Sequence, residues 1–171
     1  SLKRTIQTAH VAPRAECADL PPVCFLHGFD SSSFDFRELL PYVENRCETW
    51  AVDLIGWGFS DHSIYLKEPL LPCGPDVKSE HLFEFWKSEI RRPMCLLGVS
   101  LGGAVAVDFL LRYPEAVDAL VLSGSQGYAD GLGLLSKVPS FVSGLGVRIL
   151  QTKALRRSAN SLAYFDQDRK S

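Results

Sequence analysis

The sequence predicts an α/β fold built on a mostly parallel, doubly wound sheet. Apolar, strand-like stretches alternate along the chain with stretches of helical pattern, as expected when helices connect parallel strands. The runs 23–26 and 94–97 are continuously apolar, which is typical of strands that are buried on both faces. Of all residues 46% are hydrophobic and 22% are charged, so the chain can build a hydrophobic core.

Apolar periodicity and the positions of proline and glycine set the bounds of the expected elements. Pro41 lies near the end of one helical stretch, and Pro114 ends another. In chain order we expect a strand near His10, a strand at 22–26, a helix at 34–43, a strand from Thr49, a surface loop at 66–78, a helix at 79–90, a strand at 94–97, a helix at 101–113 and a strand at 119–123.

Residues 98–102 follow the pattern G-x-S-x-G and lie between a predicted strand and a predicted helix. In such a corner the serine occupies a strained turn that exposes its hydroxyl, and the glycines let the chain turn without steric conflict. Small residues also gather in ordinary turns, so a purely structural turn is the alternative. The strand and helix on either side favour Ser100 as the catalytic nucleophile.

A second motif, His27-Gly28-Phe29-Asp30, follows the predicted strand at 22–26. A strand that ends in this way before a helix can present a free backbone N–H group to an oxyanion, which acyl transfer requires opposite its nucleophile. The N–H groups of Phe29 and Leu101 are therefore the candidate oxyanion-hole donors. A tight turn without catalytic function is the alternative.

The third motif is Asp-Leu-x-Gly-x-Gly-x-Ser-Asp at residues 53–61, after the predicted strand that begins at Thr49. With three motifs in this order and spacing, the chain resembles the serine-nucleophile branch of the α/β-hydrolase fold family over residues 20–127. Asp53 precedes Ser100, so it does not match the position of the family's triad acid. We expect its carboxylate to fix the loop by hydrogen bonds.

The family's triad runs in the order serine, acid, histidine, whereas all four histidines here precede Ser100. His10, His27, His62 and His81 are each poorly placed to act as its general base, and Asp130 suits a solvated loop better than the role of the acid. The resemblance therefore implies a fragment, with a sheet incomplete at its C-terminal end and the acid and histidine beyond residue 171. By itself, this segment is expected to be inactive.

Two regions are expected: residues 1–127 as the N-terminal portion of the hydrolase core, and residues 128–171 as the start of a helical cap. The second region consists of short amphipathic pieces broken by glycines, and its last piece carries Lys153, Arg156 and Arg157. The family has a cap over the substrate pocket at this point. Membrane docking by a basic helix and ordinary surface helices are the alternatives.

The expected function is a serine hydrolase that forms an acyl-enzyme at Ser100 with an ester, amide or activated carbon–carbon bond of a small apolar substrate. No cofactor and no metal are implied. The alternatives are a receptor-like, non-catalytic binding protein for small molecules on the same fold, and an inactive truncated product. A downstream strand followed by Asp, and a further one followed by Gly-His, would favour the enzyme.

Composition restricts the partners to a small-molecule substrate. The net charge of −2 gives no basic surface for nucleic acid. No apolar run reaches the length of about 20 residues that spans a bilayer, so no stable membrane association is expected, and the first residues do not resemble a secretory signal.

Five irregularly spaced cysteines suggest reduced thiols in an intracellular compartment, either the cytoplasm or an organelle such as a plastid after removal of a transit peptide. The oligomeric state is not indicated.

Overall fold

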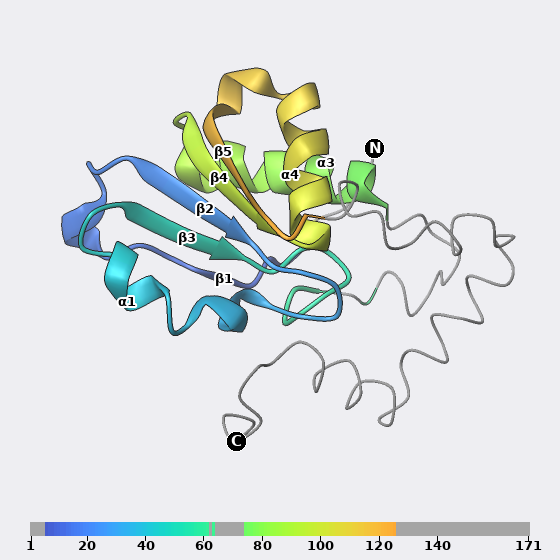
Figure 1. Cartoon of the computed structure of the whole chain (residues 1–171), viewed down its shortest axis with the longest axis horizontal. Coiled ribbons are helices and arrows are strands. Elements are labelled where there is room, and N and C mark those ends of the chain that lie inside the picture. The colour runs from blue at the N-terminus through green and yellow to red at the C-terminus, as the bar shows by residue number, and fades with distance from the viewer. Residues whose placement is uncertain (1–5, 62, 64–73, 126–171) are drawn as a thin grey trace, which may run out of the picture. The chain divides into compact units, whose positions relative to one another are not determined.

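The computed structural model describes residues 6–61, 63 and 74–125. Within them a single sheet has the strand order β1-β3-β2-β4-β5. β1 pairs with β3 in the antiparallel sense, and the other pairs are parallel. The predicted mostly parallel sheet is thus confirmed (Figure 1). The strands are β1 (His10–Val11), β2 (Pro22–Leu26), β3 (Glu48–Val52), β4 (Met94–Val99) and β5 (Val117–Ser123).

Helices cover both faces of this sheet, but unequally. The long helices α3 and α4 lie on one face, and η2 and α1 lie on the other (Figure 1). None of the helices in the described residues has the length and apolarity to cross a membrane. The helical elements are η1 (Ala15–Cys17), η2 (Ser33–Phe36), α1 (Leu40–Val43), α3 (Pro75–Phe85), the π-helical turn η3 (Trp86–Ile90), α4 (Leu101–Arg112) and η4 (Pro114–Ala116).

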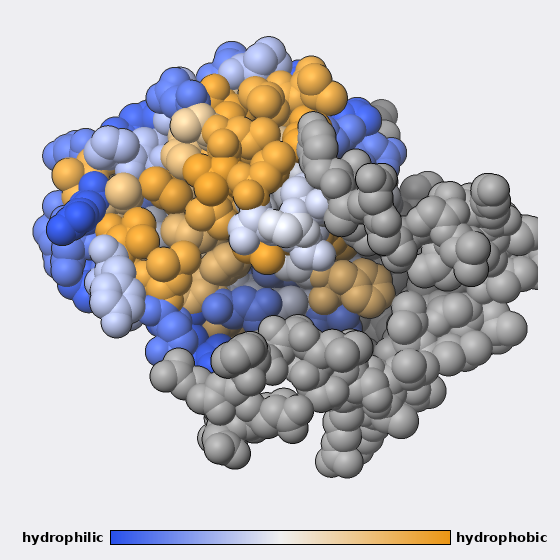
Figure 2. All heavy atoms as spheres, in the orientation of Figure 1, coloured by the Kyte–Doolittle hydropathy of each residue, from blue (hydrophilic) through white to orange (hydrophobic). Residues whose placement is uncertain are grey.

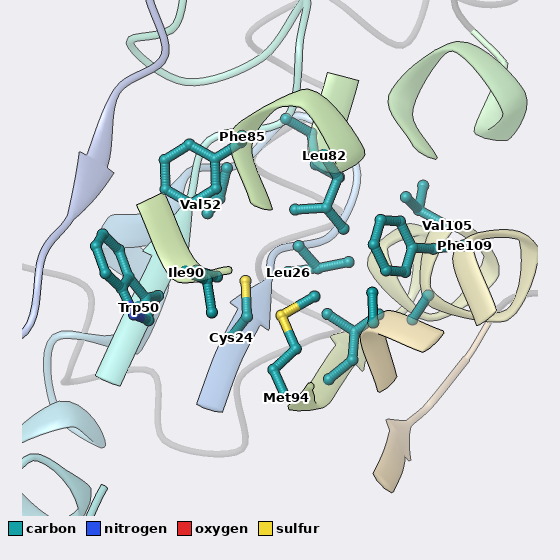
Figure 3. Close-up of a cluster of buried hydrophobic side chains, with 14 residues drawn as sticks. Cys24, Leu26, Trp50, Val52, Leu82, Phe85, Ile90, Met94, Val105 and Phe109 are labelled. Carbon is teal, nitrogen blue, oxygen red and sulfur yellow. The ribbon is translucent and has the colours of Figure 1, made fainter. Parts of the chain in front are cut away.

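The larger hydrophobic core fills the space between the sheet and helices α3 and α4. Leu26 and Met94 contribute from the strands, and Leu82 and Phe109 from the helices, all four with no exposed surface (Figure 3). Burial of each such side chain is worth about 1.5–3 kcal/mol. On the opposite face a smaller cluster joins Phe25 and Ala51 to Phe36 of η2.

Two predicted elements differ from the structure. The helix expected at 34–43 is divided into η2 and α1, and Pro41 lies in the first turn of α1 instead of near the end of a helix. Proline has no N–H group, so it is best accommodated in a first turn. For the same reason α3 begins at Pro75, within the stretch predicted as loop, and not at Ser79. The other part of that loop, 64–73, lies outside the described residues.

The division of the chain falls between Ser1–Ala129 and Asp130–Ser171. The second unit lies outside the described residues, as do Asp130 and the expected cap at 128–171. The predicted boundary at residues 127 and 128 therefore stays a prediction.

The direction in which the chain crosses the sheet reverses beside β2. From β2 the chain passes to β3 on one side, and then to β4 on the other side of β2. In open α/β sheets, ligands bind beyond the carboxyl ends of the strands at such a switch point. The segments that follow β2 and β4 contain Gly28, Phe29 and Ser100, so the topology brings the first two motifs to one place.

Strand β5 forms one edge of the described sheet and leaves apolar side chains open. Val121 is 43% exposed and Leu122 is 37% exposed. Val121 is aligned with Leu97 of β4, which lies beside the smaller core cluster. Figure 2 shows apolar surface extending over this face of the sheet. An unpaired strand with apolar side chains is a template for association with other chains.

We therefore expect the purified 171-residue chain to self-associate. Val121→Lys should reduce the association, because it places a charge on the open face of the edge strand. Leu111→Lys is the matched control, since Leu111 is 78% exposed on α4 and the same charge is added away from the edge. Size-exclusion chromatography and sedimentation velocity measure the effect. A chain that stays monomeric at all concentrations would contradict the prediction.

Candidate active site

Ser100 lies at a sharp corner between β4 and α4. Its backbone angles are φ 52° and ψ −116°, a conformation that non-glycine residues rarely adopt. Two hydrogen bonds hold the corner: Ser100 N–H donates to Ser123 O at 3.0 Å, and Gly103 N–H donates to Ser100 O at 3.0 Å. The strained turn expected for a nucleophilic serine is therefore present at Ser100.

Glycines on both sides of Ser100 allow helix α4 to approach the strands closely. A Cβ atom at Gly98 would lie 2.4 Å from Gly102 O, and one at Gly102 would lie 2.3 Å from Leu26 O. Both distances are far shorter than any real contact and involve backbone atoms, which cannot rotate away. The first turn of α4 is thus pressed against the carboxyl end of β2.

The second motif meets Ser100 at this point. A Cβ atom at Gly28 would lie 3.4 Å from the Ser100 Cβ and 3.9 Å from its Oγ. Leu101 begins α4, and the first N–H groups of a helix have no partner within the helix. The structure thus brings Ser100 together with the segments that carry the Leu101 and Phe29 N–H groups. Their role as oxyanion donors stays a prediction.

Asp53 is a fully buried carboxylate that joins the start of η2 to the loop after β3. It accepts hydrogen bonds from Ser33 N–H and, at 2.7 Å, from Phe59 N–H. Gly58 has a φ of +58°, and a Cβ there would lie 2.2 Å from Asp53 Oδ2. Ser60 Oγ donates to Asp53 O at 2.7 Å. These contacts agree with the loop-fixing role expected for Asp53.

Both ring nitrogens of His27 are engaged. Nδ1–H donates to Gly28 O at 2.8 Å, and Nε2 accepts from Leu54 N–H at 3.1 Å. This pattern requires the neutral ring, and burial lowers the pKa of His27, against the opposing effect of the Gly28 hydrogen bond. His27 therefore links the end of β2 to the loop after β3 and has no nitrogen left for Ser100.

His81 and His10 are also occupied away from Ser100, and His62 lies outside the described residues. His81 Nε2 is 2.8 Å from Thr8 Oγ1, and burial, helped by the charge of Lys78, lowers the pKa of His81 to about 4. His10 lies on β1, three strands from β4, a separation of about 14 Å. The described histidines thus behave as structural residues, as the sequence suggested.

Sequence reasoning missed the burial of Lys78, which lies in the stretch predicted as a surface loop. It is 1% exposed, its Nζ donates to Ile55 O at 3.1 Å, and it lies 5.7 Å from the centre of the Trp57 ring. No pattern in the sequence signals this burial, because it depends on how the loop after β3 meets α3.

The comparisons with known proteins agree with the fold. Residues 21–143 match the model of the alpha/beta hydrolase fold family, so the chain belongs to this family. It is 44% identical over 165 residues to the alpha/beta hydrolase domain-containing protein VTE7 of Arabidopsis thaliana, covering 96% of this chain and 48% of that protein.

Two further proteins are similar to a large part of the chain. A (lyso)-N-acylphosphatidylethanolamine lipase of Bos taurus is 29% identical over 124 residues, which cover 72% of this chain and 35% of the lipase. A solved structure of a bacterial membrane phospholipase A has a TM-score of 0.64 at 24% identity, covering 74% of this chain and 38% of that one, and shows the same fold. The chain thus spans at most about half the length of these relatives.

Gly102→Ala should destabilise the protein although alanine favours a helix. The gain in helix propensity is about 1 kcal/mol, whereas overpacking against the carbonyl of Leu26 costs about 1–3 kcal/mol or more because neither backbone can yield. Gly28→Ala is the matched control, since its Cβ would meet nothing closer than 3.4 Å. Urea unfolding measures both changes. Equal stability of the two variants would contradict the close approach.

The buried His81 should make the protein less stable as the pH falls. Its pKa is about 4 in the folded state and 6.5 when unperturbed, so the unfolded chain binds more protons between these values. We expect His81 to lower the unfolding free energy progressively from pH 6.5 to 4, by about 3 kcal/mol at most. His81→Gln should flatten this slope. Urea unfolding at several pH values measures the slope of the unfolding free energy against pH. Identical slopes for the unaltered protein and His81→Gln would refute the prediction.

Proposed function

We propose that the protein is a serine hydrolase that cleaves an ester, amide or activated carbon–carbon bond of a small apolar substrate through an acyl-enzyme at Ser100. The observation that carries the proposal is the strained backbone of Ser100 at the switch point of the sheet, with Gly28 beside it. Such strain persists only where the surrounding structure maintains it, and it clusters at functional sites.

In the proposed reaction, Ser100 Oγ attacks the carbonyl carbon and its proton passes to a histidine. The N–H groups of Leu101 and Phe29 stabilise the oxyanion. The leaving group takes the proton from the histidine, and water then hydrolyses the acyl-enzyme. We place this histidine and the triad acid in residues that follow 171, because the described histidines make their hydrogen bonds elsewhere. No cofactor takes part.

The relatives support hydrolysis of an acyl bond. The bovine protein is by name a lipase that acts on (lyso)-N-acylphosphatidylethanolamine, and another relative, 32% identical over 114 residues, is a 1-acylglycerol-3-phosphate O-acyltransferase of Arabidopsis thaliana. Both names describe the transfer of an acyl group. The lipase transfers it to water, and the O-acyltransferase transfers it to an oxygen atom of another molecule. An ester is therefore the substrate class that we favour among the three bonds.

A second candidate is a small-molecule binding protein on the same fold. It is favoured by the hydrogen bonds of His27, which occupy both ring nitrogens and leave Ser100 without a base from this residue. The two candidates differ in whether Ser100 becomes covalently modified.

In the full-length protein, Ser100→Ala should abolish labelling by a fluorophosphonate probe and lower kcat for an ester by several orders of magnitude. KM should change only a few-fold, because the pocket and the oxyanion donors remain. Asp53→Asn is the control: we expect a loss of about 1–3 kcal/mol of stability with labelling retained, since Asp53 holds loops and takes no part in the chemistry. Unchanged turnover in Ser100→Ala would make the serine a turn residue and favour the binding protein.

A further inference from the structure

Next to Gly28, which lies beside Ser100, the structure exposes an aromatic ring that the proposed mechanism does not use. Phe29 follows Gly28 directly, and its side chain is 48% exposed although it is large and apolar. Its ring meets Trp57 edge to face, with ring centres 4.5 Å apart and planes inclined at 61°. This geometry is the favourable one for an aromatic pair and adds to the burial of area. Phe29 is therefore held in a defined orientation while one side of it stays open.

The local backbone and the side chain of Lys78 hold Trp57 in place. Gly56 and Gly58, with φ values of 83° and 58°, shape the backbone on either side of Trp57. The backbone N–H of Trp57 donates to Leu54 O at 2.9 Å. The ammonium of the buried Lys78 lies 5.7 Å from the ring centre. Within the described residues the indole Nε1 is buried without a hydrogen-bond partner, so ring contacts and not a polar anchor orient the side chain. Lys78, Trp57 and Phe29 thus form a continuous series of contacts.

We propose that the Phe29 ring determines substrate specificity by packing against an apolar acyl group, with Trp57 as the residue that positions it. The inference rests on the proposed hydrolysis at Ser100. Its basis is that one residue carries two groups. In the proposed reaction the Phe29 N–H faces the developing oxyanion, and we therefore place the ring of the same residue beside the substituents of that carbonyl. A ring already held by Trp57 loses little freedom when substrate binds, which favours affinity.

This arrangement selects for acyl length. An acetyl group is too short to cover the ring, whereas a chain of several methylenes removes ring surface and its own surface from water, at about 0.8 kcal/mol for each buried methylene. The substrate class inferred is an ester of a medium or long acyl chain.

The test compares p-nitrophenyl acetate and p-nitrophenyl octanoate as substrates of the full-length protein. In Phe29→Ala the backbone N–H is retained, so we expect kcat/KM for the octanoate to fall about tenfold more than for the acetate. Phe29→Leu should recover part of the selectivity because it restores apolar volume. Trp57→Leu should lower the octanoate-to-acetate ratio in the same direction, whereas a merely structural defect would lower both rates equally.

Tyr42→Ala is the matched control. Tyr42 is 79% exposed on α1, which leads into the amino end of β3, at the opposite end of the sheet from Ser100 (Figure 1). Its selectivity should equal that of the unaltered protein. An unchanged ratio in Phe29→Ala with fluorophosphonate labelling retained would overturn the specificity role alone. Turnover that survives Ser100→Ala would overturn the proposed function itself, so the two failures are distinct.

Discussion

The close packing of the first turn of α4 against the end of β2 is the constraint on which the site depends. Gly98 and Gly102 have no room for a Cβ atom, because the carbonyl groups of Gly102 and Leu26 occupy that space. With the helix this close, the chain must reverse direction within one residue, and Ser100 takes the strained conformation. The same approach places Gly28 beside the serine. Packing of backbone against backbone therefore creates the strained corner at Ser100.

Buried polar groups then hold the loops around this corner. Asp53 accepts one backbone N–H group from the start of η2 and one from the loop after β3, and His27 joins the end of β2 to Leu54. A buried loop would otherwise leave costly unpaired N–H groups. Their hydrogen-bonding capacity is used for support, which explains how a histidine next to Gly28 can be close to the serine and still not serve as its base.

Most of the framework could be predicted because it depends on short-range patterns. Strand β2 has the bounds that its apolar run predicts, and α4 begins at Leu101 and ends within one residue of the prediction. The prediction of one helix at 34–43 was wrong. It followed the periodicity of the apolar residues and gave too little weight to the preference of Pro41 for the first turn of a helix. The start of α3 was misplaced for a related reason: Pro75 reads as a loop residue and also begins helices well.

By itself, the sequence determined the strand and helix types, the corner at Ser100 and its order relative to the second and third motifs, because glycine positions and apolar runs act over a few residues. Only the tertiary structure decided that His27 is neutral and fully bonded, that Lys78 is buried, and that Phe29 meets Trp57. The contacts of His27 with Leu54, of Lys78 with Ile55 and of Phe29 with Trp57 each join residues more than twenty positions apart. They form because the parallel strands bring their carboxyl ends, and the loops that follow, to one edge of the sheet.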